Sequence, residues 1–223
     1  MKNTDRIEIP FRYENHFILI DLIFNERLPL TFIFDTGAEN TIITQRQVTD
    51  MLGIRYEKEF RIIGSDMRTE LIAYLVQNIE FRMSALRLRR QQALVLDDDY
   101  FRFEEYTGTK VHGILGANIF RHYVVKIDYR RRIITLQKPN TFKPPGDDFL
   151  EAPLEISKNK PYLRSEVKLA EGRHAPVKLL LDTGASLALL FNLGTHPDIR
   201  LPENAIPGNI GKGLGGYLEG YLG

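Results

Sequence analysis

The apolar residues of this chain alternate with polar ones over short stretches, which is the pattern of β-strands rather than of long helices. Two stretches share one further pattern: an alternating segment, a polar turn, and an apolar run that ends in Asp-Thr-Gly-Ala. The first covers residues 17–38 and the second residues 162–185. A proline lies at the same distance before each aspartate, at Pro29 and Pro176. Each copy therefore predicts a β-hairpin whose second strand leads into an aspartate, and the repeat indicates a duplicated unit.

Further strands are predicted around the two copies, together with short helices. A strand-like segment follows each Asp-Thr-Gly, at residues 41–43 and 187–190. Prolines and a glycine mark residues 138–150 as a linker, so we expect a first lobe over residues 1–137 and a second over residues 151–223. The other expected elements are a helix at 45–52, a hairpin at 60–76 with Gly64-Ser65-Asp66 at its tip, strands at 79–83 and 92–96, a helix at 118–122 and a hairpin at 124–136.

Composition places the chain among globular proteins and excludes some kinds of chemistry. Of its 223 residues 43% are hydrophobic and 26% charged, and the formal net charge of +1 offers no field to attract nucleic acids or acidic membranes. The absence of cysteine excludes disulfides, thiolate metal ligands and a cysteine nucleophile. The first residues include acids and lack the pattern of a signal peptide. A cytoplasmic location is therefore the default expectation, while an extracytoplasmic one stays open.

Three other groups of residues have simpler explanations than a ligand site. Asp97–Asp99 have no histidine or further acid at ligand spacing, so we expect a solvated loop there. The arginines between residues 82 and 90 and at 130–132 are expected on exposed strands and a turn, not in a nucleic-acid patch. Gly211–Gly216 lacks the Gly-Lys-Ser/Thr ending of a phosphate-binding loop. The sequence thus predicts neither a metal site nor a cofactor.

The two Asp-Thr-Gly segments have a physical interpretation that depends on their being a pair. An aspartate at the end of a buried strand has a fixed position, and glycine two residues later lets another backbone approach closely. A threonine hydroxyl can donate and accept at once, so it can tie one loop to the other. If the two loops meet about a pseudo-twofold axis, Asp35 and Asp182 face each other. Because two adjacent carboxylates cannot both ionise readily, one keeps its proton, and the pair can serve as general base and general acid.

On these residues the chain resembles the retropepsin-like aspartic proteases, which are the established example of such a proton-sharing pair. The resemblance is to the bacterial form with two such lobes in one polypeptide, and it extends over essentially the whole chain. The first lobe matches in Asp35-Thr36-Gly37-Ala38, in the hairpin tip Gly64-Ser65, in Ile114-Leu115-Gly116 and in Asn118. The second lobe matches in Asp182-Thr183-Gly184-Ala185 and in the glycine-rich segment Gly211–Gly216.

The resemblance implies a mainly β fold of two related acid-protease β-barrel lobes. The second lobe is expected to be incomplete at its C-terminus, because no hydrophobic-hydrophobic-glycine triplet follows its glycine-rich segment. The triplet of the first lobe is expected to cross behind the Asp-Thr-Gly loop. The implied site consists of the catalytic pair Asp35 and Asp182, the supporting residues Thr36, Gly37, Ala38, Thr183, Gly184 and Ala185, and two flaps over the substrate at Gly64 and Ser65 and at Gly213, Gly215 and Gly216.

Two functions of different kinds follow. The first is an aspartic endopeptidase that hydrolyses a polypeptide substrate with a water activated by Asp35 and Asp182, without a cofactor. The alternative is a peptide-binding module on the same fold that has no turnover. Intact aspartates in both copies favour the enzyme. Two arrangements of partners stay open: a homodimer through the first lobe, and a C-terminal region that supplies the rest of the second lobe and a PDZ domain.

Overall fold

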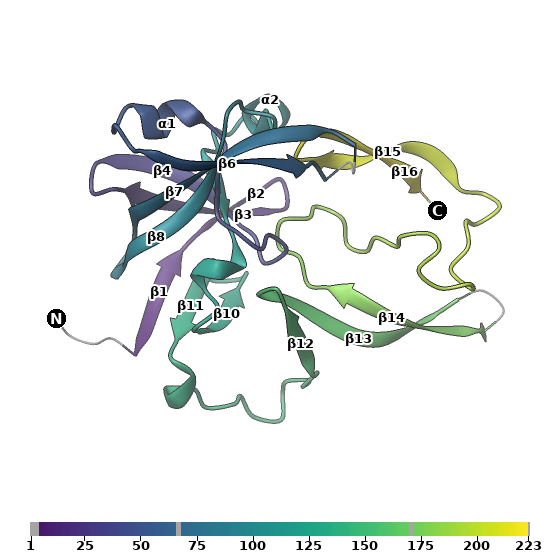
Figure 1. The fold of residues 1–223 in the computed structure, drawn as a ribbon. Helices are drawn as coiled ribbons and strands as arrows, with labels where there is room; N and C mark the ends of the chain where they lie inside the picture. Colours follow the sequence, from purple (N-terminus) through teal and green to yellow (C-terminus); the bar gives the residue numbers. More distant parts are fainter. Residues whose placement is uncertain (1–4, 66–67, 170–171, 223) are drawn as a thin grey trace.

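The computed structural model describes residues 5–65, 68–169 and 172–222, and most of its regular structure is β-strand (Figure 1). We refer to residues 5–137 as the first lobe and to residues 154–222 as the second. Figure 1 shows the first lobe as a dense body from which the green and yellow strands of the second lobe extend. The expected flap residue Asp66, part of the turn of the second hairpin (residues 170–171) and the terminal residues 1–4 and 223 lie outside the described residues.

The first lobe contains two sheets. The larger has eight strands in the order β2-β3-β4-β9-β5-β8-β7-β6, and β3 also pairs with β7, so that β3, β4, β9, β5, β8 and β7 close into a ring. The smaller has the order β1-β11-β10. The strands are β1 (Arg6–Pro10), β2 (Arg12–Glu14), β3 (Phe17–Phe24), β4 (Leu28–Phe34), β5 (Ile42–Ile43), β6 (Tyr56–Ile63), β7 (Glu70–Met83), β8 (Leu86–Leu96), β9 (Gly113–Leu115), β10 (Val124–Asp128) and β11 (Ile133–Gln137).

The β3–β4 hairpin forms where the sequence predicts it and lies at the centre of the core. Its residues on one face, among them Phe24 and Phe32, join the main apolar cluster, whereas Phe17, Leu19 and Ile33 on the other face join a smaller one. Each large side chain that is fully buried stabilises the fold by about 1.5–3 kcal/mol. Since both faces are packed, the end of β4, after which Asp35 follows, has little freedom to move.

The predicted crossing behind the first Asp-Thr-Gly loop is confirmed. Strand β9 runs parallel to β4, with Leu115 opposite Phe34, and the backbone N–H of Asp35 donates to the Leu115 carbonyl at 3.1 Å. Gly116 is needed at the crossing because a Cβ there would lie 2.4 Å from the carbonyl carbon of Asn40. Strand β9 therefore packs beside the end of β4 and fixes the start of the Asp-Thr-Gly loop through the Asp35 backbone.

Asn118, which the resemblance singled out, joins the same arrangement. The Thr41 hydroxyl donates to the Asn118 side-chain oxygen at 3.0 Å and accepts from the Gly116 N–H at 3.2 Å. Thr41 is fully buried, so both contacts satisfy a hydroxyl that has left water. Thr41 and Asn118 thus join the segment before β5 to the turn after β9.

Three predicted elements of the first lobe differ in extent. Residues 79–83 are not a separate strand but the end of β7, since Asn78 adopts a left-handed φ of 57° and the strand continues through irregular pairing with β8. Strand β8 begins at Leu86, six residues before the expected start. The helix expected at 118–122 is a short 3₁₀ turn, η1 (Ala117–Ile119). The other short helices are α1 (Arg46–Asp50), which lies where it was predicted, α2 (Phe103–Thr107) and the 3₁₀ turn η2 (Pro139–Thr141).

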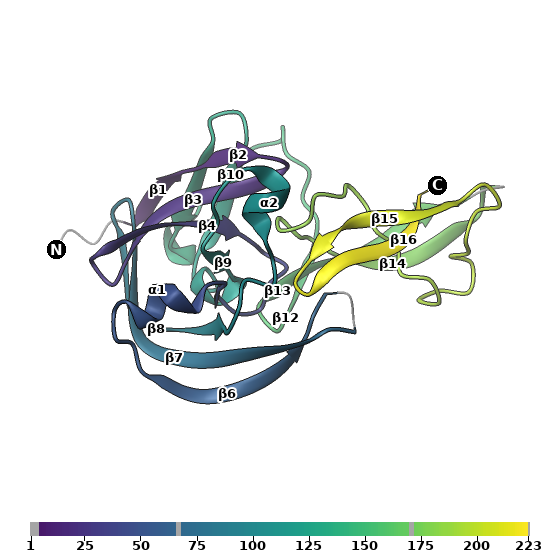
Figure 2. The ribbon, with the colours of Figure 1, turned by 90° about the horizontal axis from the view of Figure 1, so that it is seen from above.

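The second lobe repeats only part of this architecture. Its strands are β12 (Leu154–Ser157), β13 (Lys160–Lys168) and β14 (His174–Leu180) in one sheet, and β15 (Ile206–Gly213) with β16 (Gly216–Leu222) in a hairpin. Leu154, Leu163 and Leu179 lie opposite one another and so on one face of the three-stranded sheet, but Leu154 is 50% exposed. Figure 2 shows the second lobe as an extension beside the first. Its sheet therefore lacks, among the described residues, the covering layer that β3 and β4 have.

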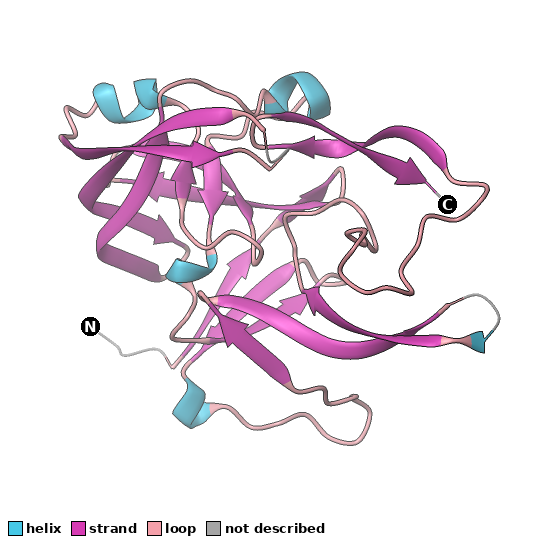
Figure 3. Cartoon of the chain, turned by 45° about the vertical axis from the view of Figure 1, so that its right-hand side comes forward, coloured by secondary structure: helices cyan, strands magenta, loops and turns pink. Residues whose placement is uncertain are grey.

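The strand predicted at residues 187–190 is wrong. These residues belong to a connection between β14 and β15 without strands or helices (Figure 3), and Leu189 is 53% exposed. Its counterpart in the first lobe, β5, is held between β8 and β9. Within the described part of the second lobe no strand stands in those two places, so the apolar pattern alone does not produce a strand. No described helix is long and apolar enough to cross a membrane.

His112 holds the start of β9 against β4 and makes the fold sensitive to pH. The backbone N–H of His112 donates to the Thr31 carbonyl at 2.8 Å, and the ring Nδ1 of His112 accepts from the Thr31 backbone N–H at 3.1 Å. The ring must therefore be unprotonated at Nδ1. Burial, reinforced by the charge of Lys110, lowers the pKa of His112 below its usual value.

We expect acidification from pH 7 to pH 5 to cost the first lobe stability through this group. A histidine with a lowered pKa in the folded state contributes stability above its unfolded pKa, and that contribution is lost as the pH falls through the folded value. His112→Asn keeps an acceptor near Nδ1 but does not titrate, so its unfolding free energy should fall less over this range than that of the intact chain. Urea unfolding of both proteins between pH 5 and pH 7 measures the difference. Parallel curves would contradict the role of His112.

Candidate active site

The two Asp-Thr-Gly loops, one after β4 and one after β14, lie against each other. The Thr36 N–H donates to the Thr183 hydroxyl and the Thr183 N–H donates to the Thr36 hydroxyl, both at 3.1 Å. The Thr36 hydroxyl in turn donates to the Leu181 carbonyl at 2.6 Å, and the Thr183 hydroxyl to the Phe34 carbonyl at 2.8 Å. This reciprocal set, which we term the threonine clasp, uses each hydroxyl as donor and acceptor at once, as the sequence predicts.

The glycines of the two loops leave the space in which the opposite carboxyl group lies. A Cβ added to Gly37 would lie 2.4 Å from Cγ of Asp182, and one added to Gly184 would lie 2.3 Å from Cγ of Asp35. Sequence reasoning expected a second backbone at this point, and the structure places a side chain there instead. Each loop therefore admits the aspartate of the other only because its third residue has no side chain.

The two carboxyl groups consequently share one small volume. Oδ1 of Asp35 accepts from the N–H groups of Gly37 at 2.7 Å and Ala38 at 3.0 Å, and Oδ1 of Asp182 accepts from the Gly184 N–H at 2.8 Å. Burial, then the charge of Asp182 and a hydrogen bond with its side chain, raise the pKa of Asp35 to about 7 against the opposing effect of the Gly37 and Ala38 N–H groups. Asp35 therefore keeps its proton up to near neutral pH.

The surroundings of the two loops are unequal. Asp35 and Ala38 are half-buried, and Ala38 packs against an apolar cluster of the first lobe. Asp182 and Ala185 are exposed, since the second lobe has no covering strands at this point among the described residues. In such a pair, the carboxyl group that holds a proton can act as the acid, and the one open to solvent can act as the base toward a bound water.

The tips of the two predicted flaps meet each other. The Ser65 N–H donates to the Leu214 carbonyl at 2.6 Å, and the Leu214 N–H donates to the Ser65 hydroxyl at 3.2 Å. The Thr69 hydroxyl donates to the Gly215 carbonyl at 3.3 Å. In Figure 1 the yellow β15–β16 hairpin reaches the end of the β6–β7 hairpin. The two hairpins thus form one continuous cover.

The predicted flap glycines have distinct places in this cover. Gly64 donates to the Thr69 carbonyl at 2.8 Å and closes the first tip. Gly213 lies against Ser65, where a Cβ would be 2.6 Å from the Ser65 Cβ. Gly216 begins β16 with a φ of 141° that favours glycine. Sequence reasoning missed Leu214, although a single large apolar residue inside a run of glycines is the signal that could have identified it.

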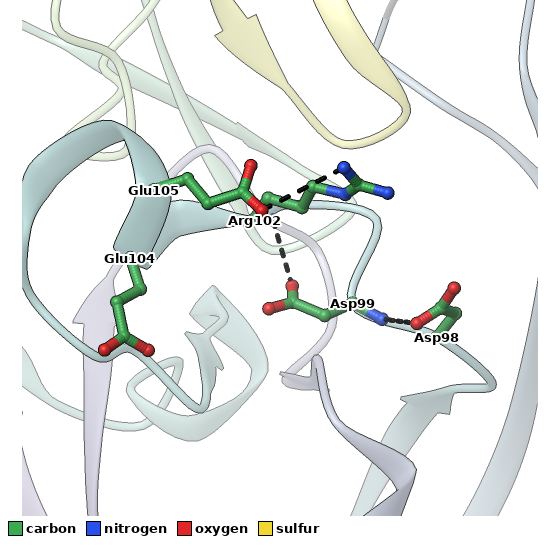
Figure 4. Close-up of a pocket in the computed structure, with 5 residues that line it drawn as sticks. All are labelled: Asp98, Asp99, Arg102, Glu104 and Glu105. Carbon is green, nitrogen blue, oxygen red and sulfur yellow. Dashed lines mark hydrogen bonds and ion pairs between the residues drawn. The ribbon is translucent and has the colours of Figure 1, made fainter.

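The acidic loop near residue 98 forms an open pocket that does not include Asp35 or Asp182. Its lining residues are Asp98, Asp99, Arg102, Glu104 and Glu105. The Asp99 carboxylate accepts from the backbone N–H of Arg102 at 3.1 Å. The carboxylates around the pocket point in different directions (Figure 4). Within the described ranges, no group of three or more His, Cys, Asp or Glu residues is placed to hold a metal ion.

Comparison with known proteins gives one family match and two similar solved structures. Residues 20–119 match the family described as aspartyl protease. A retropepsin-like aspartic protease from Rickettsia conorii is 16% identical, with a TM-score of 0.41 over 59% of this chain and 98% of that one. Basic 7S globulin from soybean is 10% identical, with a TM-score of 0.47 over 72% of this chain and 57% of that one. No curated protein matches the chain.

The family match includes the first Asp-Thr-Gly loop, the β6–β7 hairpin and the β9 crossing. These are the elements on which the sequence resemblance to retropepsin-like proteases rests, and all three occupy the expected places in the fold. Residues 20–119, a little under half of the chain, thus match the aspartyl protease family.

Proposed function

We propose that the chain is an aspartic endopeptidase in which Asp35 and Asp182 form the catalytic pair. The match of residues 20–119 to the aspartyl protease family supports peptide-bond hydrolysis in general. The observation that carries the specific proposal is the reciprocal contact at Gly37 and Gly184, where each loop leaves room for the opposite carboxyl group. Such an arrangement has no role in packing a core, but it brings two acids close enough to share a proton.

Asp35 serves as the general acid because its raised pKa keeps it protonated, and Asp182 serves as the general base. A water bound between them loses a proton to Asp182 while its oxygen attacks the carbonyl carbon of the peptide bond. Asp35 gives its proton to the carbonyl oxygen in the same step. Collapse of the tetrahedral intermediate then breaks the C–N bond: Asp182 gives the proton that it took from water to the departing amine, and one hydroxyl of the intermediate returns its proton to Asp35.

The substrate is an extended polypeptide that lies between the hairpin tips and the floor made by the two Asp-Thr-Gly loops. Its backbone can pair with the edges of the hairpins, as in other cases of strand addition. The contacts of Ser65 with Leu214 must open for entry and re-form over the bound peptide. Closure then excludes water from the reacting atoms.

One alternative has its own support. Asp182 is exposed and the three-stranded sheet of the second lobe presents uncovered apolar side chains, which favours a module that binds peptides without turnover. A homodimer through two copies of Asp35 has less support, since Asp182 of the same chain already lies beside Asp35.

We also propose that the lobes divide at a linker over residues 138–150, between a first lobe at 1–137 and a second at 151–223. Two observations on the described residues support this division. No strand among β1–β11 pairs with one among β12–β16, and between η2 and β12 the chain forms no strand or helix.

The endopeptidase is tested by cleavage of a denatured protein mixture from acid to neutral pH, read by mass spectrometry. Asp35→Asn and Asp182→Asn should each lower the rate at least about a hundredfold, because each removes a proton acceptor or donor from the pair. Asp148→Asn makes the same change at an exposed position of the linker and should leave the rate unchanged. Near-normal cleavage by either variant of the pair would refute the mechanism, and peptide binding without cleavage by the intact chain would support the binding module.

The rate should fall as the pH rises through about 7. The pair works with one proton, and Asp35, whose pKa is raised to about 7, loses that proton in this range. The same shift makes folding stability fall as the pH rises from about 4 to about 7, since the folded state holds a proton that the unfolded chain releases. A kcat/KM profile measures the first effect, and urea unfolding of the intact chain beside Asp35→Asn measures the second. A rate that is constant from pH 6 to pH 9 would contradict the assignment.

The threonine clasp can be tested with a matched pair of variants. Thr36→Val keeps the shape but removes a donor and an acceptor, so it should lower the unfolding free energy by about 2 kcal/mol and reduce cleavage. Thr36→Ser keeps the hydroxyl and should retain most of both. Thermal unfolding and the cleavage rate provide the readouts. A larger loss in Thr36→Ser than in Thr36→Val would show that the methyl group, not the hydroxyl, matters.

A further inference from the structure

Leu214 is the residue through which the second-lobe hairpin enters the first lobe. Its side chain is only 9% exposed, whereas Ile206, Tyr217 and Leu222 on the same hairpin are each more than half exposed. It belongs to an apolar cluster whose other buried members all come from the first lobe: Leu71, Ala73, Leu96 and Ile114. The hairpin therefore places one leucine in a ready-made apolar site of the other lobe.

This site adjoins the candidate catalytic pair. Ile114 lies opposite both Ile33 and Ile42 in the strands on either side of the first Asp-Thr-Gly loop. Ala38 packs against the same cluster, and its N–H donates to Asp35. Leu71 and Ala73 belong to β7, the second strand of the first flap. Leu214 is thus buried between a flap and the floor beside Asp35, in the space that the proposed function gives to the peptide.

Hydrogen bonds at the hairpin tip also hold the docked position. Among the described residues, the Leu214 backbone bonds to Ser65 and the Thr69 hydroxyl donates to the Gly215 carbonyl, while Gly213 has no side chain to resist withdrawal. Burial of one leucine corresponds to roughly a tenfold to hundredfold preference for the docked position. A peptide side chain of similar size can displace Leu214, because its own burial in the site offsets the loss of that preference, whereas a small side chain cannot displace it.

We propose that Leu214 is a specificity-determining residue that competes with the substrate for this apolar site. The inference rests on the proposed function, because it assumes that a peptide lies under the flaps. When a peptide has a leucine at the matching position, that leucine replaces Leu214 in the site, so the burial of one leucine offsets the exposure of the other and the peptide gains little affinity. A peptide with alanine there binds while Leu214 stays in place. The intact protein therefore accepts both, and Leu214 broadens the range of its substrates.

The test compares leucine with alanine at each peptide position, using peptide mixtures in which one position is fixed and the others are randomised. In Leu214→Ala the site is empty, so the ratio of kcat/KM for leucine over alanine should rise about tenfold at one position. Leu214→Met, which still fills the site, should keep the ratio of the intact chain. Leu222→Ala makes the same truncation at an exposed position of the hairpin and should also keep it. Because a ratio is measured, partial misfolding of a variant cancels.

An unchanged ratio at every position in Leu214→Ala would overturn the proposal, even if the overall rate fell. The same mixtures are also tested for equilibrium binding, which separates this inference from the proposed function. A binding ratio that rises in Leu214→Ala without any cleavage by the intact chain would support the role of Leu214 and refute the endopeptidase. The absence of both cleavage and binding would refute both.

Discussion

The threonine clasp fixes the relation between the two halves of this protein. Each threonine hydroxyl is both acceptor and donor: it accepts from the threonine N–H of the opposite loop and donates to the carbonyl of the residue that precedes the aspartate of that loop. Because these bonds cross the axis between the loops, neither loop can shift without breaking contacts in both lobes. The glycine contacts depend on this registration, since a displacement of about an ångström would bring each carboxyl group into the opposite backbone. The proximity of the two carboxyl groups is thus a consequence of hydrogen bonds that the threonines make.

The clasp is symmetric, but the structure around it is not. The first loop is supported from below by β9 and by the contact between Thr41 and Asn118. The second loop follows a sheet whose apolar face is exposed at Leu154 and Ile156. In these surroundings burial, then the charge of Asp182, raises the pKa of Asp35 to about 7. Asymmetry of the lobes therefore places two residues that the sequence presents as equivalent in different surroundings.

The sequence predicts the hairpins, the paired loops and both flaps, because each depends on local pattern and on the repeat. It does not predict that residues 79–83 continue β7, since the irregular pairing at Asn78 depends on a partner strand rather than on local composition. The failed strand at 187–190 has the same origin: its apolar pattern resembles that of β5, but the neighbours that would pair with it are absent from the described second lobe. The role of Leu214 also depends on tertiary contacts, because a leucine among glycines gives no indication of which lobe it will enter. What the pattern cannot supply is the identity of the partner.

The uncovered sheet of the second lobe bears on the order in which the chain acquires its structure. The first lobe closes its own ring of strands and buries its own core, so it can collapse without help. The second has few buried apolar side chains among the described residues, namely Ala175, Ile199 and Leu214, and the last of these lies inside the first lobe. Its β-strands are therefore expected to become ordered on a surface that already exists, with the loop after β4 and the tip of the first flap as the points of attachment. The folded first lobe then serves as the surface on which the second lobe becomes ordered, and the second Asp-Thr-Gly loop reaches its place beside the first only after the first lobe has folded.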